Sequence, residues 1–360
     1  MRISLFVFLF CFSLVSFSQN ENLAKNYFDR GDFDKALPIF KALFENTPNK
    51  NDYFLYYLNT QQQLENFEEA QKLIEERLKF TKNHPIFIVE LGRNYLLQNQ
   101  PQKADSIFNV AIKSIYENPK ITFSIANTFE KYSLLDKAIE TYEKGMALDE
   151  SLDYNSRLAR LYGEQGLLEK MFESYLNIIE RNPSFLIAAQ RNFSRYIIED
   201  PQNEANELLR KALLRRSQNN PDIFYNQLLS WLFIQQKQYD RAFTQEKAIY
   251  RRTFDGLNEM LELALIAMDD KDYPISKEIL GFIIENSTSE MDRLEGYQYL
   301  MEIEIRTGQK ETYPEIKSKF TNLISTFGEG PKTFGLQVDY NRFLAYKIND
   351  KSTAVQNLKS

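Results

Sequence analysis

The chain has 360 residues, of which 43% are hydrophobic and 14% aromatic, with 12 glycines and 11 prolines. This composition excludes a disordered chain and a collagen-like one, and the length exceeds what a single compact core usually serves. The formal net charge is −6, with charges of both signs interspersed and no long basic block. We therefore expect either two domains or an architecture that grows by addition, and no nucleic-acid partner.

The first eighteen residues differ from everything after them. Arg2 precedes an apolar run from Ile3 to Leu14, and Ser16-Phe17-Ser18 supplies small residues before Gln19. This order is typical of a secretory signal peptide. A retained membrane anchor is the alternative, but the run is shorter than the roughly 20 residues that a spanning helix needs. We predict a signal peptide over residues 1–18 and an exported protein, periplasmic or otherwise extracytoplasmic.

The only cysteine, Cys11, lies inside this apolar run. A mature chain would therefore carry no thiol that an oxidising compartment could cross-link, which agrees with a periplasmic destination. Phe10 and Phe12 flank the cysteine, so the small residue expected before a lipidated cysteine is missing. No later stretch is apolar for long enough to cross a bilayer, and we expect no membrane span after signal cleavage.

Small residues then recur at a spacing of 34, at positions 36, 70, 104 and 138, all of them alanine. The series continues less regularly through Met171, Ala205, Ala242 and Ser276. Upstream of each lies another apolar segment with helical spacing, such as VELGRNYLLQNQ in the third unit. Each unit therefore predicts two amphipathic helices, and the small residue marks the place where they cross.

The third unit carries Leu91-Gly92, Tyr95, Ala104, Phe108 and Ala111 in this register. The same roles fall on Leu23-Ala24, Tyr27, Ala36, Phe40 and Pro48 in the first unit, and on Leu158-Ala159, Tyr162, Gly166, Tyr175 and Pro183 in the fifth. This pattern resembles the tetratricopeptide repeat (TPR). The resemblance implies an all-α fold, a right-handed superhelical solenoid of stacked antiparallel helix pairs whose concave surface is lined by the first helices.

The resemblance is strong over residues 19–289, which we predict to form about eight helix pairs. The sixth unit departs from it, because SFLIAAQRNFSRYIIED lacks the signature and places Phe193 where a small residue is usual. Residues 290–360 read as degenerate helical repeats, with a loop over Phe327–Gly335. The helical segment KSTAVQNL ends at the last residues without a polar capping helix, so we expect a truncated last pair and a chain that continues past Ser360.

Residues able to support catalysis are scarce. The single histidine, His84, lies between Asn83 and Pro85 at a predicted repeat junction, where an exposed loop residue is the simplest interpretation. No phosphate loop, nucleophile elbow or Cys/His metal motif is present. Paired carboxylates leave an all-helical glycoside-acting enzyme as a remote alternative, although Glu68-Glu69 and Asp269-Asp270 are best read as solvated helix ends. We predict no enzymatic activity, no cofactor and no metal.

The resemblance instead implies a protein that binds other proteins. It could be a free periplasmic scaffold or adaptor of the cell envelope, or the sensory, ligand-binding portion of a longer membrane receptor that continues beyond residue 360.

The predicted binding residues follow the small or leucine position of each first helix. They are Lys25, Asn59, Arg93, Asn127 and Arg160, with Arg157 and Arg191 on neighbouring groove positions and then Trp231, the only tryptophan. The lysine, asparagine and arginine side chains can donate hydrogen bonds to carboxylates, while the indole of Trp231 suits an apolar side chain. The predicted partner is thus a protein or peptide segment, acidic or ending in a carboxylate.

Overall fold

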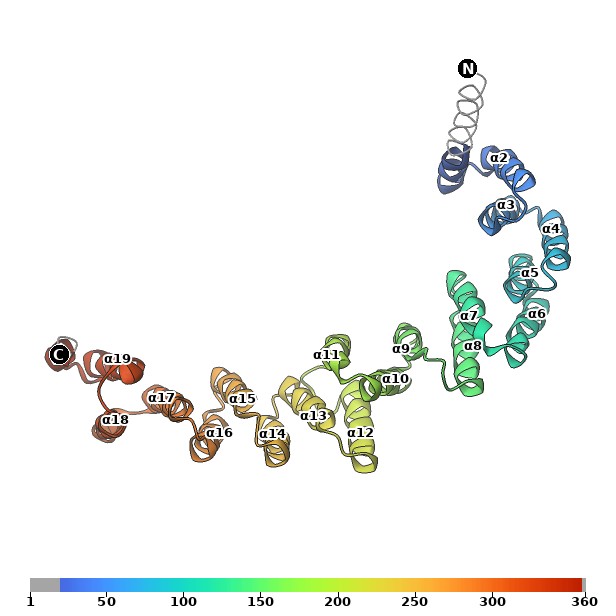
Figure 1. Ribbon diagram of the computed structural model, residues 1–360. Coiled ribbons are helices and arrows are strands. Elements are labelled where there is room, and N and C mark those ends of the chain that lie inside the picture. The colour runs from blue at the N-terminus through green and yellow to red at the C-terminus, as the bar shows by residue number, and fades with distance from the viewer. Residues whose placement is uncertain (1–19, 358–360) are drawn as a thin grey trace, which may run out of the picture. The chain divides into compact units, whose positions relative to one another are not determined.

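The computed structural model describes residues 20–357, which fold into helices and short connections with no strand among them (Figure 1). The predicted signal peptide, residues 1–18, lies outside the described residues. The chain divides into two compact units, Met1–Leu161 and Tyr162–Ser360, called unit 1 and unit 2 below. Within each unit, consecutive helices lie side by side as antiparallel pairs, so the predicted all-α solenoid of stacked helix pairs is confirmed.

The described part of unit 1 opens with helical residues 20–29. The helices that follow are α2 (Phe33–Asn46), α3 (Asn51–Gln63), α4 (Phe67–Phe80), α5 (Pro85–Leu97), α6 (Pro101–Lys113), α7 (Thr122–Lys131) and α8 (Leu135–Leu148), with 3-10 turns η1 (Ser114–Tyr116) and η2 (Pro119–Ile121) before α7. The last helix, α9 (Asn155–Glu164), contains the division between the units. The first helices of the pairs form one layer and the second helices form the other (Figure 1).

Unit 2 continues with the same alternation. Its helices are α10 (Leu168–Arg181), α11 (Leu186–Phe193), α12 (Glu204–Asn219), α13 (Ile223–Gln235), α14 (Tyr239–Thr253), α15 (Leu257–Asp269), α16 (Tyr273–Asn286), α17 (Glu290–Thr307), α18 (Tyr313–Phe327), α19 (Phe334–Arg342) and α20 (Lys351–Asn357). Short 3-10 turns η3 (Pro183–Phe185), η4 (Lys310–Thr312) and η5 (Pro331–Thr333) precede α11, α18 and α19, and a π-helical segment, η6 (Phe343–Ile348), extends α19.

The turn inside most pairs repeats one backbone geometry. A residue with positive φ ends the first helix at Gly31, Glu65, Asn99, Ser133, Gly166, Lys237 and Lys271. The next amide bonds to the carbonyl five residues before it, as in Asn66 N to Gln61 O at 2.9 Å and Gln238 N to Phe233 O at 2.9 Å. This is the Schellman arrangement, which satisfies the last carbonyls of a helix and reverses the chain.

The recurring small residues lie where two helices of a pair touch. Ala36, Ala70, Ala104 and Ala138 are 0–1% exposed. Ser276, the last member of the series, is also buried and donates a hydrogen bond to Ala264 O at 2.8 Å, across the pair that α15 and α16 form. Larger side chains would push these helices apart, because buried helix surfaces are already close-packed.

The sixth repeat, formed by α11 and α12, lacks the repeat signature, and its two helices are connected in a different way. α11 has only eight residues, and the chain between it and α12 is fastened by Asn206, whose side-chain amide donates to Ile198 O at 2.7 Å and to Asp200 O at 2.6 Å. Phe193 is fully buried and packs edge-on against Phe172, with ring centroids 5.1 Å apart. An aromatic side chain therefore occupies the place that a small residue has in the other repeats.

The loop predicted over Phe327–Gly335 is shorter than expected. α18 ends at Phe327, and only the next three residues lack helical structure. Gly328 and Gly330 have φ of 84° and 153°, which stops α18, and Pro331 then begins a 3-10 turn because its missing N–H costs nothing in a first turn. The final helical segment, α20, falls where the last second helix was predicted.

Candidate functional site

The structure places every predicted binding residue on a first helix. Lys25 lies in the helix over residues 20–29, Asn59 in α3, Arg93 in α5, Asn127 in α7, Arg157 and Arg160 in α9, Arg191 in α11 and Trp231 in α13. Lys25, Asn59, Arg93 and Trp231 are partly buried, and the other four are exposed. We call the exposed side of the first helices the first-helix face of each unit.

Asn59 and Arg93 are brought together in unit 1. The Arg93 guanidinium donates to Asn59 Oδ1 at 2.8 Å and also to the Gln62 side chain, and it lies over the Tyr132 ring at 4.1 Å from the centroid. Gln62 is held in turn by Asn94, to whose Oδ1 it donates at 3.2 Å. The guanidinium is therefore fixed between neutral groups of α3 and α7, in a geometry favourable to cation–π attraction.

Glu90 lies beside this group and was not among the predicted residues. It is 2% exposed, accepts a hydrogen bond from the Tyr132 hydroxyl at 2.7 Å, and its second oxygen, Oε2, has no partner. Burial raises the pKa of Glu90, although the hydrogen bond from Tyr132 acts in the opposite direction. Its signal in the sequence is a single acid inside the apolar stretch IFIVELG.

Arg157 and Arg160 share one carboxylate. Arg160 forms a short ion pair with Glu130, and Arg157 lies 3.9 Å from the same oxygen. Glu130 also accepts a hydrogen bond from Tyr142 at 2.7 Å. These two arginines therefore offer a ligand less positive charge than their positions in the sequence indicate.

Lys25 also has an acidic neighbour. Its ammonium group contacts Glu21 at 2.7 Å, and the same carboxylate accepts from Tyr53 at 2.6 Å and from Lys50 at 3.3 Å. The hydrogen bonds from Lys25 and Tyr53 lower the pKa of Glu21 to about 2. Two lysines surround one glutamate here, so one positive charge of this cluster is left over.

Trp231 lines a cleft in unit 2 that we call the Trp231 cleft. It has a volume of about 440 Å³ and is bounded by α11, α13, α14, α15 and the connection before α15. Its apolar wall includes Ile187, Ile234 and Ile266 around the indole, and its polar lining includes Ser230 and four carboxylates. The indole ring is 6.3 Å from the buried Phe193 ring, so one side of Trp231 packs on the core and the other faces the cleft.

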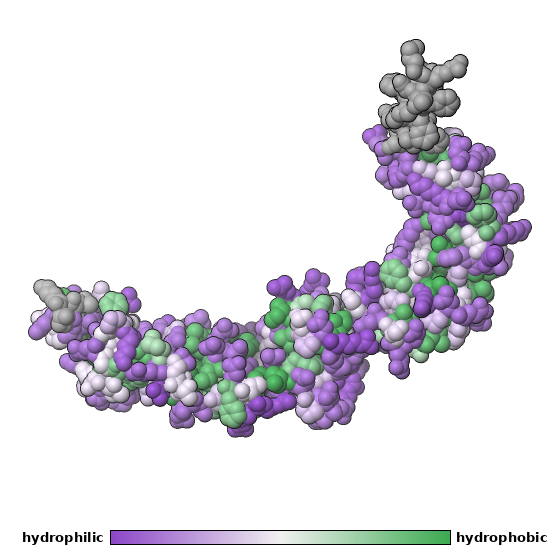
Figure 2. Space-filling model, in the orientation of Figure 1, coloured by the Kyte–Doolittle hydropathy of each residue, from purple (hydrophilic) through white to green (hydrophobic). Residues whose placement is uncertain are grey.

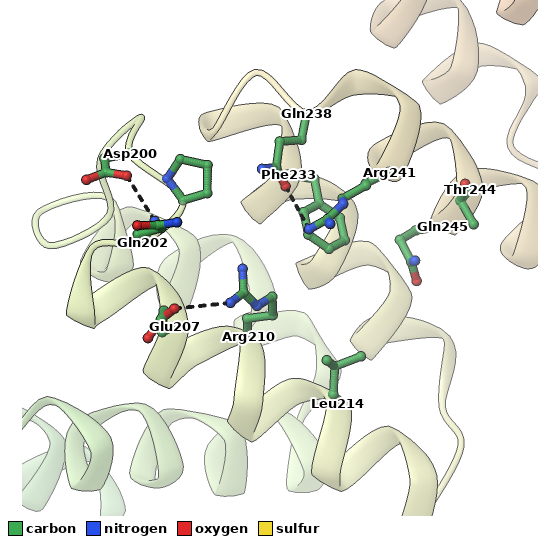
Figure 3. Close-up of a pocket in the computed structure, with 11 residues that line it drawn as sticks. Asp200, Gln202, Glu207, Arg210, Leu214, Phe233, Gln238, Arg241, Thr244 and Gln245 are labelled. Carbon is green, nitrogen blue, oxygen red and sulfur yellow. Dashed lines mark hydrogen bonds and ion pairs between the residues drawn. The ribbon is translucent and has the colours of Figure 1, made fainter.

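A second hollow lies on the other layer of unit 2, among α12, α13 and α14 (Figure 3). It is larger, at about 770 Å³, and its charged residues are of both signs. Arg210 pairs with Glu207 at 3.6 Å, and Arg241 bonds to Gln238 at 3.2 Å, so these side chains satisfy one another. Figure 2 shows hydrophilic residues over much of the visible surface of each unit, with hydrophobic residues in seams between helices.

The single histidine and the acidic residues form no metal-binding group in the described part of the chain. His84 is exposed at the start of α5, with its ring 6.0 Å from Phe87, as the predicted junction position implies. Among residues 20–357, no cluster of three or more His, Cys, Asp or Glu side chains could hold a metal ion. None of the helices in that range is long and apolar enough to cross a bilayer.

Comparison with known proteins gives one curated relative at modest identity. The chain is 26% identical over 169 residues to the TPR repeat-containing protein MJ1428 of Methanocaldococcus jannaschii, which covers 45% of this chain and 29% of that protein. The matched part is thus less than a third of the relative's own length. No family model matches the chain. Over the matched part of its length, the chain is similar to a TPR protein.

Two solved structures are also similar to the chain. The thermophilic TPR protein TTC0263 of Thermus thermophilus is 19% identical, with a TM-score of 0.29, over 49% of this chain and 97% of that one. Yeast Tom70 is 15% identical, with a TM-score of 0.30, over 94% of this chain and 83% of that one.

Proposed function

We propose that this chain is a non-catalytic protein-binding scaffold of the cell envelope, and that an extended acidic segment of a partner lies along the first-helix face of unit 1. The observation that carries the proposal is the fixed position of Arg93. Its hydrogen-bond partners, Asn59 and Gln62, are neutral, and it lies over the Tyr132 ring. A guanidinium held in this way keeps its charge available and loses little conformational freedom when a carboxylate binds.

The neighbouring clusters favour the same sign of ligand. The Lys25 cluster sets two lysines against one glutamate, and burial of Glu90 beside Arg93 favours its neutral form. The shared Glu130 weakens the contribution of Arg157 and Arg160. We therefore assign the largest part of the charge recognition to Arg93 and a smaller part to α9.

The test is capture of envelope proteins by the immobilised chain. Arg93→Glu, Arg157→Glu and Arg160→Glu introduced together should remove the captured proteins, while the far-UV circular dichroism spectrum stays helical. Lys72→Glu, Lys103→Glu and Lys113→Glu provide the matched control, because these exposed lysines lie on second helices and give the same change in charge. Equal loss in both triple variants, or no loss in either, would refute recognition by the first-helix face.

Glu130→Gln gives a test in the opposite direction. Removing this negative charge, which Arg157 and Arg160 share, makes the surface of α9 more positive and should strengthen capture of the same proteins. Weaker capture by Glu130→Gln would mean that these arginines do not face the partner.

We propose export because the sequence of residues 1–18 is typical of a signal peptide. Mass spectrometry of the protein from fractionated cells should find an N-terminus at Gln19 in the extracytoplasmic fraction. An uncleaved Met1 in the cytoplasmic fraction would contradict export.

A further inference from the structure

The Trp231 cleft combines exposed aliphatic side chains with the only tryptophan of the sequence. Ile187 is 55% exposed and Ile266 is 40% exposed, although isoleucine is among the residue types most often buried. Both line the same cleft as the indole. Its volume, about 440 Å³, lies within the range of small ligand-binding pockets and accommodates one long side chain with its flanking backbone.

The charged lining of this cleft has a single sign. Glu246 of α14, Asp255 of the connection, and Glu259 and Glu262 of α15 all line it, and no lysine or arginine does. Other acids of unit 2 have a basic partner, such as Glu173 with Arg216 and Glu304 with Lys277. Carboxylates that line an apolar cleft without a cation are complementary to a cationic guest.

Two buried polar groups in the cleft point to the same conclusion, and the first of them, a hydroxyl, is independent of the four carboxylates. Ser230 is 1% exposed, lines the cleft, and its Oγ has no hydrogen-bond partner. Buried hydroxyls without a partner are rare, because each costs free energy that a hydrogen bond would recover. Glu246 is 9% exposed at the same place, and burial raises the pKa of its carboxyl. A guest with N–H donors and a positive charge would satisfy both groups.

We propose that the Trp231 cleft is the binding site for a lysine or arginine side chain presented by an extended partner segment. The alkyl stem of the basic residue packs on Trp231, Ile187 and Ile266, and its charged end reaches the carboxylates of α14 and α15. Long basic side chains suit such a site because the stem is apolar and only the end is charged. The assignment rests on the proposed protein-binding function and specifies the partner chemistry of unit 2, which is opposite in sign to that of unit 1.

Because Trp231 is the only tryptophan, its fluorescence reports on the cleft directly. The full chain should be titrated with a capped pentapeptide that has lysine between isoleucine and leucine. Matched peptides carry norleucine or glutamate in place of the lysine. The lysine peptide should change the emission saturably, while the norleucine peptide binds at least about tenfold more weakly and the glutamate peptide does not bind.

Variants then connect the signal to the carboxylates. Glu259→Gln with Glu262→Gln should weaken binding of the lysine peptide by about tenfold or more. Asp240→Asn with Glu285→Gln, two exposed positions of unit 2 that do not line the cleft, should leave the affinity unchanged. Calorimetry with Trp231→Ala supplies a readout that does not need the indole, and there the lysine peptide should no longer bind.

Three results would overturn the assignment: equal affinity for the lysine and norleucine peptides, tighter binding of the glutamate peptide, or no saturable signal with lysine. The proposed scaffold function has a separate test. If envelope proteins are still captured through Arg93 while the lysine peptide does not bind, the cleft assignment fails and the scaffold function stands.

Discussion

Gly92 offers the sharpest test of how the helix pairs are packed. It lies in α5, opposite α6, and a Cβ added there would be 2.4 Å from Cε1 of Phe108. Ordinary van der Waals contact begins near 3.4 Å, so the ring would have to move by about 1 Å. Phe108 has no room to move, because it is 4% exposed and its ring meets that of Phe129 edge-on at 5.3 Å.

The magnitude follows from two opposing contributions. Alanine is the better helix former by roughly 1 kcal/mol, whereas overpacking a close-packed core costs typically 1–3 kcal/mol. Gly92→Ala should therefore destabilise the protein by about 1 kcal/mol. Gly281→Ala is the matched control, because Gly281 lies within α16 and a Cβ there meets nothing within 4 Å. This variant should stabilise the protein by about 0.5–1 kcal/mol.

Urea unfolding followed by circular dichroism measures both variants. The difference between them isolates the packing cost, since the gain in helix propensity is common to both. Phe108→Leu introduced with Gly92→Ala should recover part of the loss, because the smaller side chain leaves room for the new methyl group. If Gly92→Ala raises stability as much as Gly281→Ala does, the close contact between α5 and α6 is wrong.

Three further predictions concern the turns inside the helix pairs, the buried Glu90 and the sixth repeat. Lys237→Gly should raise the melting temperature and Gly166→Ala should lower it, because both positions have positive φ and only glycine adopts this conformation without strain; shifts of one sign in both variants would contradict the shared turn geometry. The pKa of Glu90 is raised above its ordinary value of 4.5, so the folded state binds more protons than the unfolded state and stability should fall as pH rises from about 5. The melting temperatures of the native chain and of Glu90→Gln should be measured from pH 5 to 8. As pH rises, the melting temperature of the native chain should fall relative to that of Glu90→Gln, and a constant difference between the two would refute this. Asn206→Leu should destabilise unit 2 by roughly 2–4 kcal/mol in urea unfolding, because two carbonyls lose their donor; a change below about 0.5 kcal/mol would mean that water replaces the amide.

The repeating part of the fold could be predicted because its physical requirements recur along the sequence. A small residue at the crossing and an aromatic four residues later specify a helix pair wherever they occur, and the alanines at 36, 70, 104 and 138 are all buried as this requires. The positive-φ residues of the turns could be predicted from the sequence only in part. Gly31 and Gly166 indicate a positive φ, whereas Glu65, Lys237 and Lys271 do not, since their side chains disfavour that conformation. There the stacking of the two helices imposes the turn.

The helix positions of the candidate binding residues could be predicted from the sequence, but not all of their side-chain partners could. The 34-residue spacing places Asn59 and Arg93 on successive first helices, and their hydrogen bond follows from that placement. The partner of Arg157 and Arg160 could not be deduced in the same way. Glu130 lies near the C-terminal end of α7, outside the register used to choose the donors, and only the packing of α7 against α9 brings it to them.

The proposed role of the Trp231 cleft illustrates why the sign of a ligand would depend on more than the first helices. The series of predicted binding residues, one on each first helix, ends at Trp231, where it predicts contact with an apolar side chain. Ile187 and Ile266 line the same cleft as Trp231 and make this part of it apolar. The charge of the cleft comes from elsewhere, because its carboxylates belong to α14, to the connection at Asp255 and to successive turns of α15. A net charge of −6 spread over both units conceals this difference. Under the proposed assignments, recognition by such an array is decided locally, by the few charged groups that reach each cleft without a partner of their own.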